Sequence, residues 1–188
     1  MKKIEEILET TVEYLNREKI DYVLVGAIAV MVYGSPRTTV DLDLVVSVEE
    51  GELENFADYL QGEGFFADPE DMKQAFREKT HFSAEEKESL FRLDIKGIYE
   101  KKERVTLENR KKIGYEGMEI YVASPEDTIA NKLYYGSEQD IEDAESIYVR
   151  QGDKLDHEYL EEMCEALGVE EKLEEMKKEI EELKEEWK

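Results

Sequence analysis

The stretch from residue 23 to residue 46 constrains this chain most, because it reads as strand, turn, short helix, loop and strand in close succession. It runs VLVGAIAVMVYGSPRTTVDLDLVV, and its second strand carries Asp41 and Asp43. Side chains alternate across a strand, so these carboxylates share one face, while Val40, Leu42 and Leu44 are predicted to point into a core. Two neighbouring carboxylates repel each other unless a cation lies between them or one of them is protonated. The pattern therefore predicts a magnesium site on this strand.

This stretch resembles the signature of the nucleotidyltransferase superfamily, which has the DNA polymerase β-like fold. In that family a strand ends in Gly-Gly or Gly-Ser, a short helix follows, and an Asp-x-Asp pair lies on the next strand. The spacing is similar to that of AbiEii-type and minimal nucleotidyltransferases of bacteria and archaea. The residues that carry the resemblance are Gly26, Ala27, Ala29, Gly34, Arg37, Thr39, Asp41 and Asp43. Ala27 is a departure, because the family usually has Gly or Ser there, so a serine hydroxyl contact to phosphate is not available.

The resemblance implies an α/β (α+β) nucleotidyltransferase fold, in which a mixed β-sheet is flanked by helices and followed by a C-terminal helical segment. The expected domains are a catalytic core with an N-terminal helix over 1–122 and helices packed on that core over 123–188. Apolar periodicity and turn residues predict the individual elements. Helices are expected over 2–18, 26–33, 53–62 and 71–77, and the last third of the chain is expected to be helical, with helices over 124–135 and 139–150 and an apolar stripe from 169 onwards. Strands are expected over 22–25, 41–47, 65–66, 79–84 and 90–97, with a further hairpin within 112–122.

A third acid completes the predicted metal site. Metal sites of this superfamily use an acid from a neighbouring strand, and Asp94 has the expected placement. The resemblance therefore implies that Asp41, Asp43 and Asp94 are catalytic and hold two Mg²⁺ ions, with Asp94 also helping to deprotonate the acceptor. Two structural alternatives stay open: Asp94 pairs with Lys96 on the strand surface, or the other two acids cap the preceding threonine loop.

Five residues are predicted to bind the nucleotide phosphates. Gly26 and Ala27 lie where a strand meets a helix N-terminus, and free backbone N–H groups there suit phosphate. Arg37 has the forked donors that phosphate prefers, although an ion pair with the acids is the alternative. Thr39 is expected to orient a ligand carboxylate. Lys132 lies in a segment that resembles the helix from which a lysine of AbiEii-like proteins reaches the phosphates, and the acids at 140 and 143 resemble that group's next helix.

The charge of the chain bears on its partners. The formal net charge is −24, and an acidic surface repels nucleic acid, whose phosphates supply most of its non-specific affinity for proteins. One basic segment stands out between residues 92 and 112, and it is either solvated surface or a face that binds phosphate or acceptor. Its cations are Arg92, Lys96, Lys101, Lys102, Arg104, Arg110, Lys111 and Lys112.

Several remaining features are expected to be structural. Cys164 has no second cysteine to pair with and is predicted to pack as a small apolar side chain. His81 is expected to be structural, with a place beside Asp94 as the alternative. An apolar stripe near the C-terminus either packs on its own domain or forms a dimer contact. It consists of Leu173, Met176, Ile180, Leu183 and Trp187. No apolar run approaches about 18 residues and the N-terminus is polar, so a cytoplasmic protein without a membrane span is predicted.

These observations lead to one predicted function and an alternative. The predicted function is Mg²⁺-dependent transfer of a nucleoside monophosphate from a nucleoside triphosphate to a hydroxyl acceptor, which is an RNA end such as that of tRNA, a protein or a small molecule. Enzymes of this type include toxins of toxin–antitoxin systems, which implies an antitoxin as one partner, with a homodimer as another arrangement. The alternative is a non-catalytic nucleotide-binding or partner-binding module on the same fold. An antibiotic-modifying transferase is a further version of the enzyme.

Overall fold

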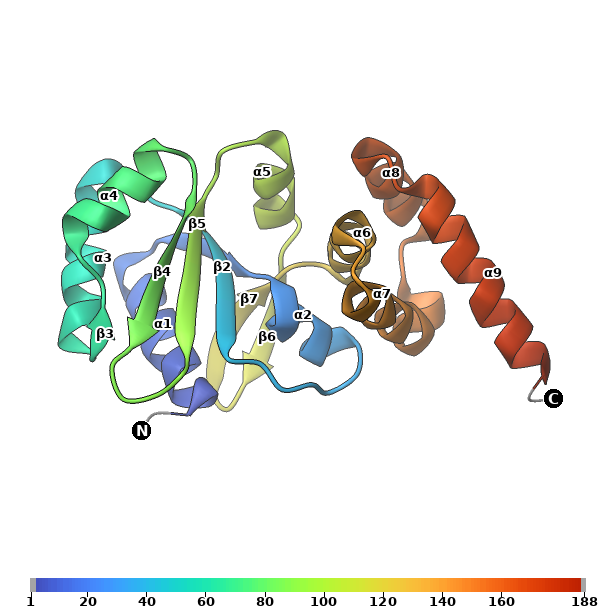
Figure 1. The fold of residues 1–188 in the computed structure, drawn as a ribbon, viewed down its shortest axis with the longest axis horizontal. Coiled ribbons are helices and arrows are strands. Elements are labelled where there is room, and N and C mark those ends of the chain that lie inside the picture. Colours follow the sequence, from blue (N-terminus) through green and yellow to red (C-terminus); the bar gives the residue numbers. More distant parts are fainter. Residues whose placement is uncertain (1–2, 187–188) are drawn as a thin grey trace. The chain divides into compact units, whose positions relative to one another are not determined.

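The computed structural model describes residues 3–186, which form two compact units (Figure 1). The N-terminal unit comprises the chain up to Ile28 together with Thr38–Ala123. The C-terminal unit comprises Ala29–Arg37 together with the chain from Ser124 onwards. Each unit therefore consists of two segments of the chain, and the first boundary between the units falls within the short helix that follows the first strand.

The N-terminal unit is built on a mixed sheet. In the described part of the chain this sheet has seven strands in the order β3-β4-β5-β2-β1-β7-β6. The central strand β2 pairs antiparallel with β1 and parallel with β5, and the β4–β5 and β6–β7 pairs are antiparallel. The strands are β1 (Asp21–Leu24), β2 (Asp41–Ser47), β3 (Phe65–Phe66), β4 (His81–Glu86), β5 (Arg92–Gly97), β6 (Lys111–Tyr115) and β7 (Met118–Val122).

Helices of the N-terminal unit bury the apolar residues that alternate along these strands. Leu42, Leu44 and Leu93 are fully or almost fully buried. The helices contribute apolar stripes at helical spacing, and the rings of Tyr14 and Phe56 stack with their centroids 5.0 Å apart. Burial of such side chains is the main source of stability for the sheet. The helices are α1 (Ile4–Glu18), α3 (Glu50–Gly62), α4 (Pro69–Arg77) and α5 (Lys101–Glu108), and Figure 1 shows α3 and α4 beside the β3–β4 edge.

The helix α5 was not expected from the sequence. Its residue Leu107 packs with Val23, Val45 and Ala123 in a small apolar cluster. Because Val45 is two residues beyond Asp43 on the same strand, this cluster lies on the sheet face that carries the acids. The helix therefore covers the far end of that face.

The C-terminal unit is helical, and its helix α6 begins as the sequence predicts. Ser124 caps α6 by accepting a hydrogen bond from the backbone N–H of Asp127 at 3.0 Å, and Pro125 occupies the first turn. Ser137 caps α7 in the same way. The helices are α2 (Gly26–Tyr33), shared between the units, α6 (Pro125–Tyr135), α7 (Glu138–Gln151), the 3₁₀ turn η1 (Gly152–Lys154), α8 (His157–Leu167) and α9 (Glu170–Glu186).

The end of α2 packs closely on α7. A Cβ atom added at Gly34 would lie 2.4 Å from the Ser146 hydroxyl, so only glycine fits there. Hydrogen bonds reinforce the contact, because Arg150 donates to the Gly34 carbonyl and Gln151 donates to the Tyr33 carbonyl. Gly34, one of the residues that carry the family resemblance, therefore allows α2 and α7 to pack closely within this unit.

The apolar stripe of α9 faces its own unit for most of its length. Leu173, Met176 and Ile180 are buried, and α9 contacts α6, α7 and α8. Leu183 is exposed, and Trp187 lies outside the described residues. Cys164 is fully buried, and burial raises the pKa of its thiol to about 11. None of the helices within residues 3–186 has both the length and the apolar character needed to cross a membrane.

Candidate active site

The acids of β2 lie on one face of the sheet, at the beginning of the strand. Asp41 and Asp43 are half-buried, and they alternate with the buried Leu42 and Leu44. The expectation that Val40 also points into the core is wrong, because its side chain is 46% exposed. The strand begins at Asp41, so the alternation does not extend back to Val40. The two carboxylates nevertheless point the same way.

Asp94 is the direct neighbour of Asp43 across the parallel β2–β5 pair. Paired residues of adjacent strands project to the same face, so the three predicted metal ligands occupy one side of two adjoining strands. Asp94 is also paired with Ser83 of β4, and the Ser83 hydroxyl donates a hydrogen bond to Asp94 Oδ1. Sequence reasoning missed Ser83. It considered His81, which is exposed and lies opposite Lys96 rather than opposite Asp94.

An arginine lies among these acids. Arg92 is paired with Asp41 in the β2–β5 register, and its Nε atom lies 2.8 Å from Asp41 Oδ1 and 3.3 Å from Asp94 Oδ2. The carboxylates of Asp94 and Asp41 raise the pKa of Arg92. The alternative that Asp94 pairs with Lys96 is wrong, because Asp94 pairs with Arg92 while Lys96 Nζ lies 2.6 Å from a carboxylate oxygen of Glu103.

Gly26 forms a tight corner next to Asp43. It has φ +59°, in the left-handed region, and a Cβ atom built on it would lie 2.3 Å from Asp43 Oδ2. The backbone N–H of Val25 donates to the Asp43 carbonyl at 3.0 Å, which ties the end of β1 to β2. Ala27 follows with its side chain buried, so that side chain offers no contact to a ligand. Glycine is required at this corner for both its φ angle and its size.

One observation fits a divalent cation at the three acids. Asp41 Oδ1 is buried and accepts no hydrogen bond, although Arg92 Nε lies near it. The missing side chain at Gly26 allows the Asp43 carboxylate to lie against the corner. Within the described residues, however, no three Asp, Glu, His or Cys side chains are already grouped as a metal site. The carboxylate oxygens of the three acids are the kind of ligand that Mg²⁺ prefers. Arg92 lies among these carboxylates.

Thr39 bonds to the backbone of the acid strand. Its hydroxyl donates to the Asp41 carbonyl at 3.0 Å and accepts from the Asp41 N–H at 3.1 Å. These bonds fix the start of β2. The threonine therefore orients Asp41 through the main chain rather than through the carboxylate.

Arg37 and Lys132 belong to an ion cluster of the C-terminal unit, made of Arg37, Lys132, Asp140 and Asp143. Asp143 Oδ2 lies 2.5 Å from an Arg37 guanidinium nitrogen and 2.8 Å from Lys132 Nζ, which is also 2.7 Å from Asp140 Oδ1. Burial alone would raise the pKa of Asp140, but hydrogen bonds from Lys132 and Ser137 lower it. Arg37 thus pairs with an acid of α7 instead of the acids of β2. In this cluster two cations are balanced by two carboxylates.

The basic segment between residues 92 and 112 is largely neutralised by acids of its own unit. Besides Arg92 and Lys96, Lys102 pairs with Glu100 at 3.3 Å. Two of the last three cations of the segment are paired as well, Arg110 with Asp21 and Lys112 with Glu119. Cations held in this way offer less charge to a nucleic acid.

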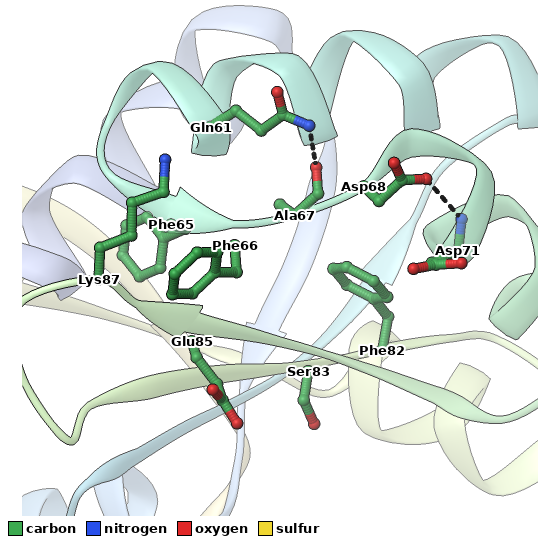
Figure 2. Close-up of a pocket in the computed structure, with 10 residues that line it drawn as sticks. All are labelled: Gln61, Phe65, Phe66, Ala67, Asp68, Asp71, Phe82, Ser83, Glu85 and Lys87. Atoms are coloured by element: carbon green, nitrogen blue, oxygen red, sulfur yellow. Dashed lines mark hydrogen bonds between the residues drawn. The ribbon is translucent and has the colours of Figure 1, made fainter.

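A groove of about 450 Å³ opens at the edge of the sheet, beside β3 and β4. Figure 2 shows Phe82 on one side of β4 and Ser83 and Glu85 on the other. The Lys87 ammonium lies 5.5 Å from the centre of the Phe66 ring. The three acids of the β2–β5 face are not among the residues that line this groove.

Comparisons with known proteins bear on what this site does. A family model described as nucleotidyltransferase of unknown function (DUF6036) matches residues 2–188. No relative was found among curated proteins.

Solved structures similar to this chain share its fold. The solution structure of the antibiotic-resistance factor ANT(2'')-Ia is 15% identical, with a TM-score of 0.57 over 90% of this chain and 94% of that one. A crystal structure of ANT(2'')-Ia in complex with adenylyl-2''-tobramycin is 15% identical, with a TM-score of 0.56 over 86% and 95%. An antigenic nucleotidyltransferase-like protein from Paracoccidioides brasiliensis is 18% identical, with a TM-score of 0.51 over 85% of each chain. At these identities the similarity establishes the nucleotidyltransferase fold.

Proposed function

This chain belongs to the family of nucleotidyltransferases of unknown function (DUF6036), and on that premise we propose that it transfers a nucleoside monophosphate from a nucleoside triphosphate to a hydroxyl group. In this reaction the acceptor oxygen forms a bond to the α-phosphorus, the bond from that phosphorus to the leaving oxygen breaks, and pyrophosphate departs. The acceptor hydroxyl loses its proton to a base. The observation that carries the proposal is the pairing of Asp43 with Asp94, with Asp41 on the same face.

We propose that Asp41, Asp43 and Asp94 hold Mg²⁺, two ions in the complete site. Bound metal would neutralise charge on the phosphate oxygens and lower the pKa of the attacking hydroxyl. The chain itself supplies the orientation of the ligands, because Thr39 fixes the start of β2 and Ser83 donates to Asp94. In this proposal Asp94 accepts the proton of the acceptor hydroxyl.

In the N-terminal unit we assign phosphate binding to the backbone at Gly26 and Ala27, where α2 begins and its first N–H groups have no partner within the helix. For Arg37 and Lys132 of the C-terminal unit, phosphate binding stays a prediction from the sequence. Within that unit both cations pair with the carboxylate of Asp143.

The acceptor we favour is a small molecule with a hydroxyl group, rather than an RNA end or a protein. The net charge of −24 disfavours a polyanionic partner, and five cations of the basic segment already form ion pairs. The structurally similar ANT(2'')-Ia has been captured with adenylyl-2''-tobramycin, a nucleotide joined to a small molecule. A toxin acting on tRNA remains the competing version, and it would need a basic surface for its substrate.

One observation favours the alternative of a non-catalytic nucleotide-binding module. Within residues 3–186, Asp41, Asp43 and Asp94 are not already grouped as a metal site. Arg92 forms ion pairs with two of them, Asp41 and Asp94. A module of this kind would bind triphosphate without releasing pyrophosphate. Pyrophosphate release therefore separates the two functions.

The test is incubation with each α-labelled nucleoside triphosphate and Mg²⁺, together with pools of small hydroxyl compounds, tRNA or proteins as acceptors. We expect label on a small molecule and a loss of at least about a hundredfold in Asp43→Asn. Asp58→Asn, an exposed aspartate of α3, removes the same charge and should leave transfer unchanged. Transfer that persists in Asp43→Asn would refute the metal assignment, and label on tRNA would refute the choice of acceptor.

A further inference from the structure

Arg92 lies in the middle of the face that carries the three acids. Its place in β5 is opposite Asp41, and Asp94 is two residues further along the same strand. The backbone N–H of Arg92 donates to the Val40 carbonyl at 3.0 Å, which holds the base of this side chain beside the start of β2. The position of the arginine is therefore set by the sheet itself.

The guanidinium of Arg92 engages the oxygens that a metal ion would use. Its Nε atom is 2.8 Å from Asp41 Oδ1 and 3.3 Å from Asp94 Oδ2. Asp41 Oδ1 is buried and accepts no hydrogen bond, so its contact with Arg92 is one of charge and proximity. Two cations cannot both occupy the space between the same two carboxylate oxygens, because they repel each other.

The side chain of Arg92 has room to leave. It is 46% exposed, whereas the side chain of Asp94 is only 17% exposed. A long, half-exposed arginine can swing toward solvent or toward a bound phosphate, while the carboxylates are fixed by their strands.

We propose that Arg92 is a built-in counterion that a divalent metal must displace, so that it lowers the affinity of the nucleotide-free protein for metal. This inference rests on the proposed metal site. In the free protein Arg92 compensates the acids and keeps them in position on the sheet. Metal then binds strongly when it arrives with the triphosphate, whose phosphates supply further ligands for the ion and a partner for the released guanidinium. Arg92 is thus a positioning residue.

The test compares Mn²⁺ binding to the nucleotide-free protein in wild type and Arg92→Gln, by calorimetry and by electron paramagnetic resonance. We expect Arg92→Gln to bind Mn²⁺ about tenfold more tightly, because one positive charge beside the ion is removed. Arg92→Lys, which keeps the charge, should stay near wild type. The matched control is Arg77→Gln, which removes an exposed arginine of the same unit that pairs with Glu50.

Melting temperature provides a second readout that does not depend on activity. Without metal, Arg92→Gln should melt lower than wild type, because the carboxylates lose their counterion, and added Mn²⁺ should raise its melting temperature more than that of wild type. If Arg92→Gln binds Mn²⁺ no more tightly than wild type while Asp43→Asn loses binding, the proposed role of Arg92 is wrong. The proposed metal site would still stand in that case. If no variant binds Mn²⁺, even with nucleotide present, both this inference and the proposed metal site are wrong.

Discussion

The most direct test of the site's architecture is the substitution Gly26→Ala. Gly26 has φ +59°, and a Cβ atom there would lie 2.3 Å from Asp43 Oδ2 and 3.0 Å from Asp43 Cγ. Contacts this short do not occur for real Cβ atoms, so either the Asp43 carboxylate turns away or the corner between β1 and α2 opens. The substitution should therefore remove a predicted metal ligand without changing an acid.

The expected magnitude has two parts. The left-handed conformation costs an alanine about 1–2 kcal/mol, which corresponds to a fall in melting temperature of about 2–8 °C for a chain of this size. Displacement of the Asp43 carboxylate adds a specific loss, which we expect to weaken Mn²⁺ binding by at least about tenfold. Only the second part affects function.

A matched control separates these two parts. Gly117, in the turn between β6 and β7, has φ +88°, and nothing lies within 4 Å of a Cβ atom built on it. Gly117→Ala should therefore lose stability to a similar extent while Mn²⁺ binding and nucleotidyl transfer stay at the wild-type level. Both variants are measured by thermal melting, by Mn²⁺ titration and by pyrophosphate release.

Two outcomes would refute the role of the contact between Gly26 and Asp43. Wild-type Mn²⁺ affinity in Gly26→Ala would mean that Asp43 is not held against the glycine corner in the working site. An equal loss of Mn²⁺ binding in Gly117→Ala would mean that general destabilisation, and not the contact with Asp43, causes the effect.

Three further predictions concern the C-terminal unit. Asp143→Asn should lower the free energy of unfolding, measured with urea, by about 3 kcal/mol, because Arg37 and Lys132 lose the buried carboxylate that they share. A loss below about 1 kcal/mol would contradict the burial of that charge. Gly34→Ala should lower the free energy of unfolding by about 1–3 kcal/mol in the same assay, because its Cβ would overlap the Ser146 hydroxyl. If this variant is as stable as wild type, α2 is not packed on α7 in this way. Burial raises the pKa of Cys164 to about 11 from its usual value near 9, so the buried thiol favours the folded state below pH 9 and that contribution is lost as the pH rises through 11. The stability advantage of wild type over Cys164→Ala should therefore shrink by about 2–3 kcal/mol above pH 9, and a difference that does not vary with pH would show that the thiol is not buried.

Local patterns predicted the elements around the acids well. The alternation after residue 40 and the Asp-x-Asp pair gave the strand 41–47 with its bounds, and the serine and proline at 124 and 125 gave the start of α6. These features are encoded within a few neighbouring residues, through side-chain alternation, capping and turn chemistry. The family matched by the whole chain agrees with the resemblance that this stretch carries.

Contacts across long sequence distances were harder to predict. The parallel pairing that brings Asp94 opposite Asp43 joins strands about fifty residues apart, and no turn fixes its register. The contact of Arg92 with Asp41 depends on that register, whereas Ser83 meets Asp94 through the register of the β4–β5 hairpin. Arg37 pairs with Asp143, 106 residues away.

The helix α5 was missed for a different reason. Its sequence KKERVTLE has few apolar residues, so no amphipathic period is visible. One of its buried residues is Glu103, which the structure accommodates by pairing it with Lys96. Tertiary contacts thus determine this helix where its own sequence does not.

The path of the chain through α2 has a consequence for protein engineering. Because the helix starts in one unit and continues in the other, the polypeptide passes from unit to unit at residues 28, 37 and 123. A fragment beginning at Ser124 would lack Gly34, whose carbonyl accepts from Arg150, and would leave that side of α7 uncovered. Neither unit can therefore be exchanged as a cassette by cutting the chain once, and a functional graft has to carry the nine residues 29–37 along with it.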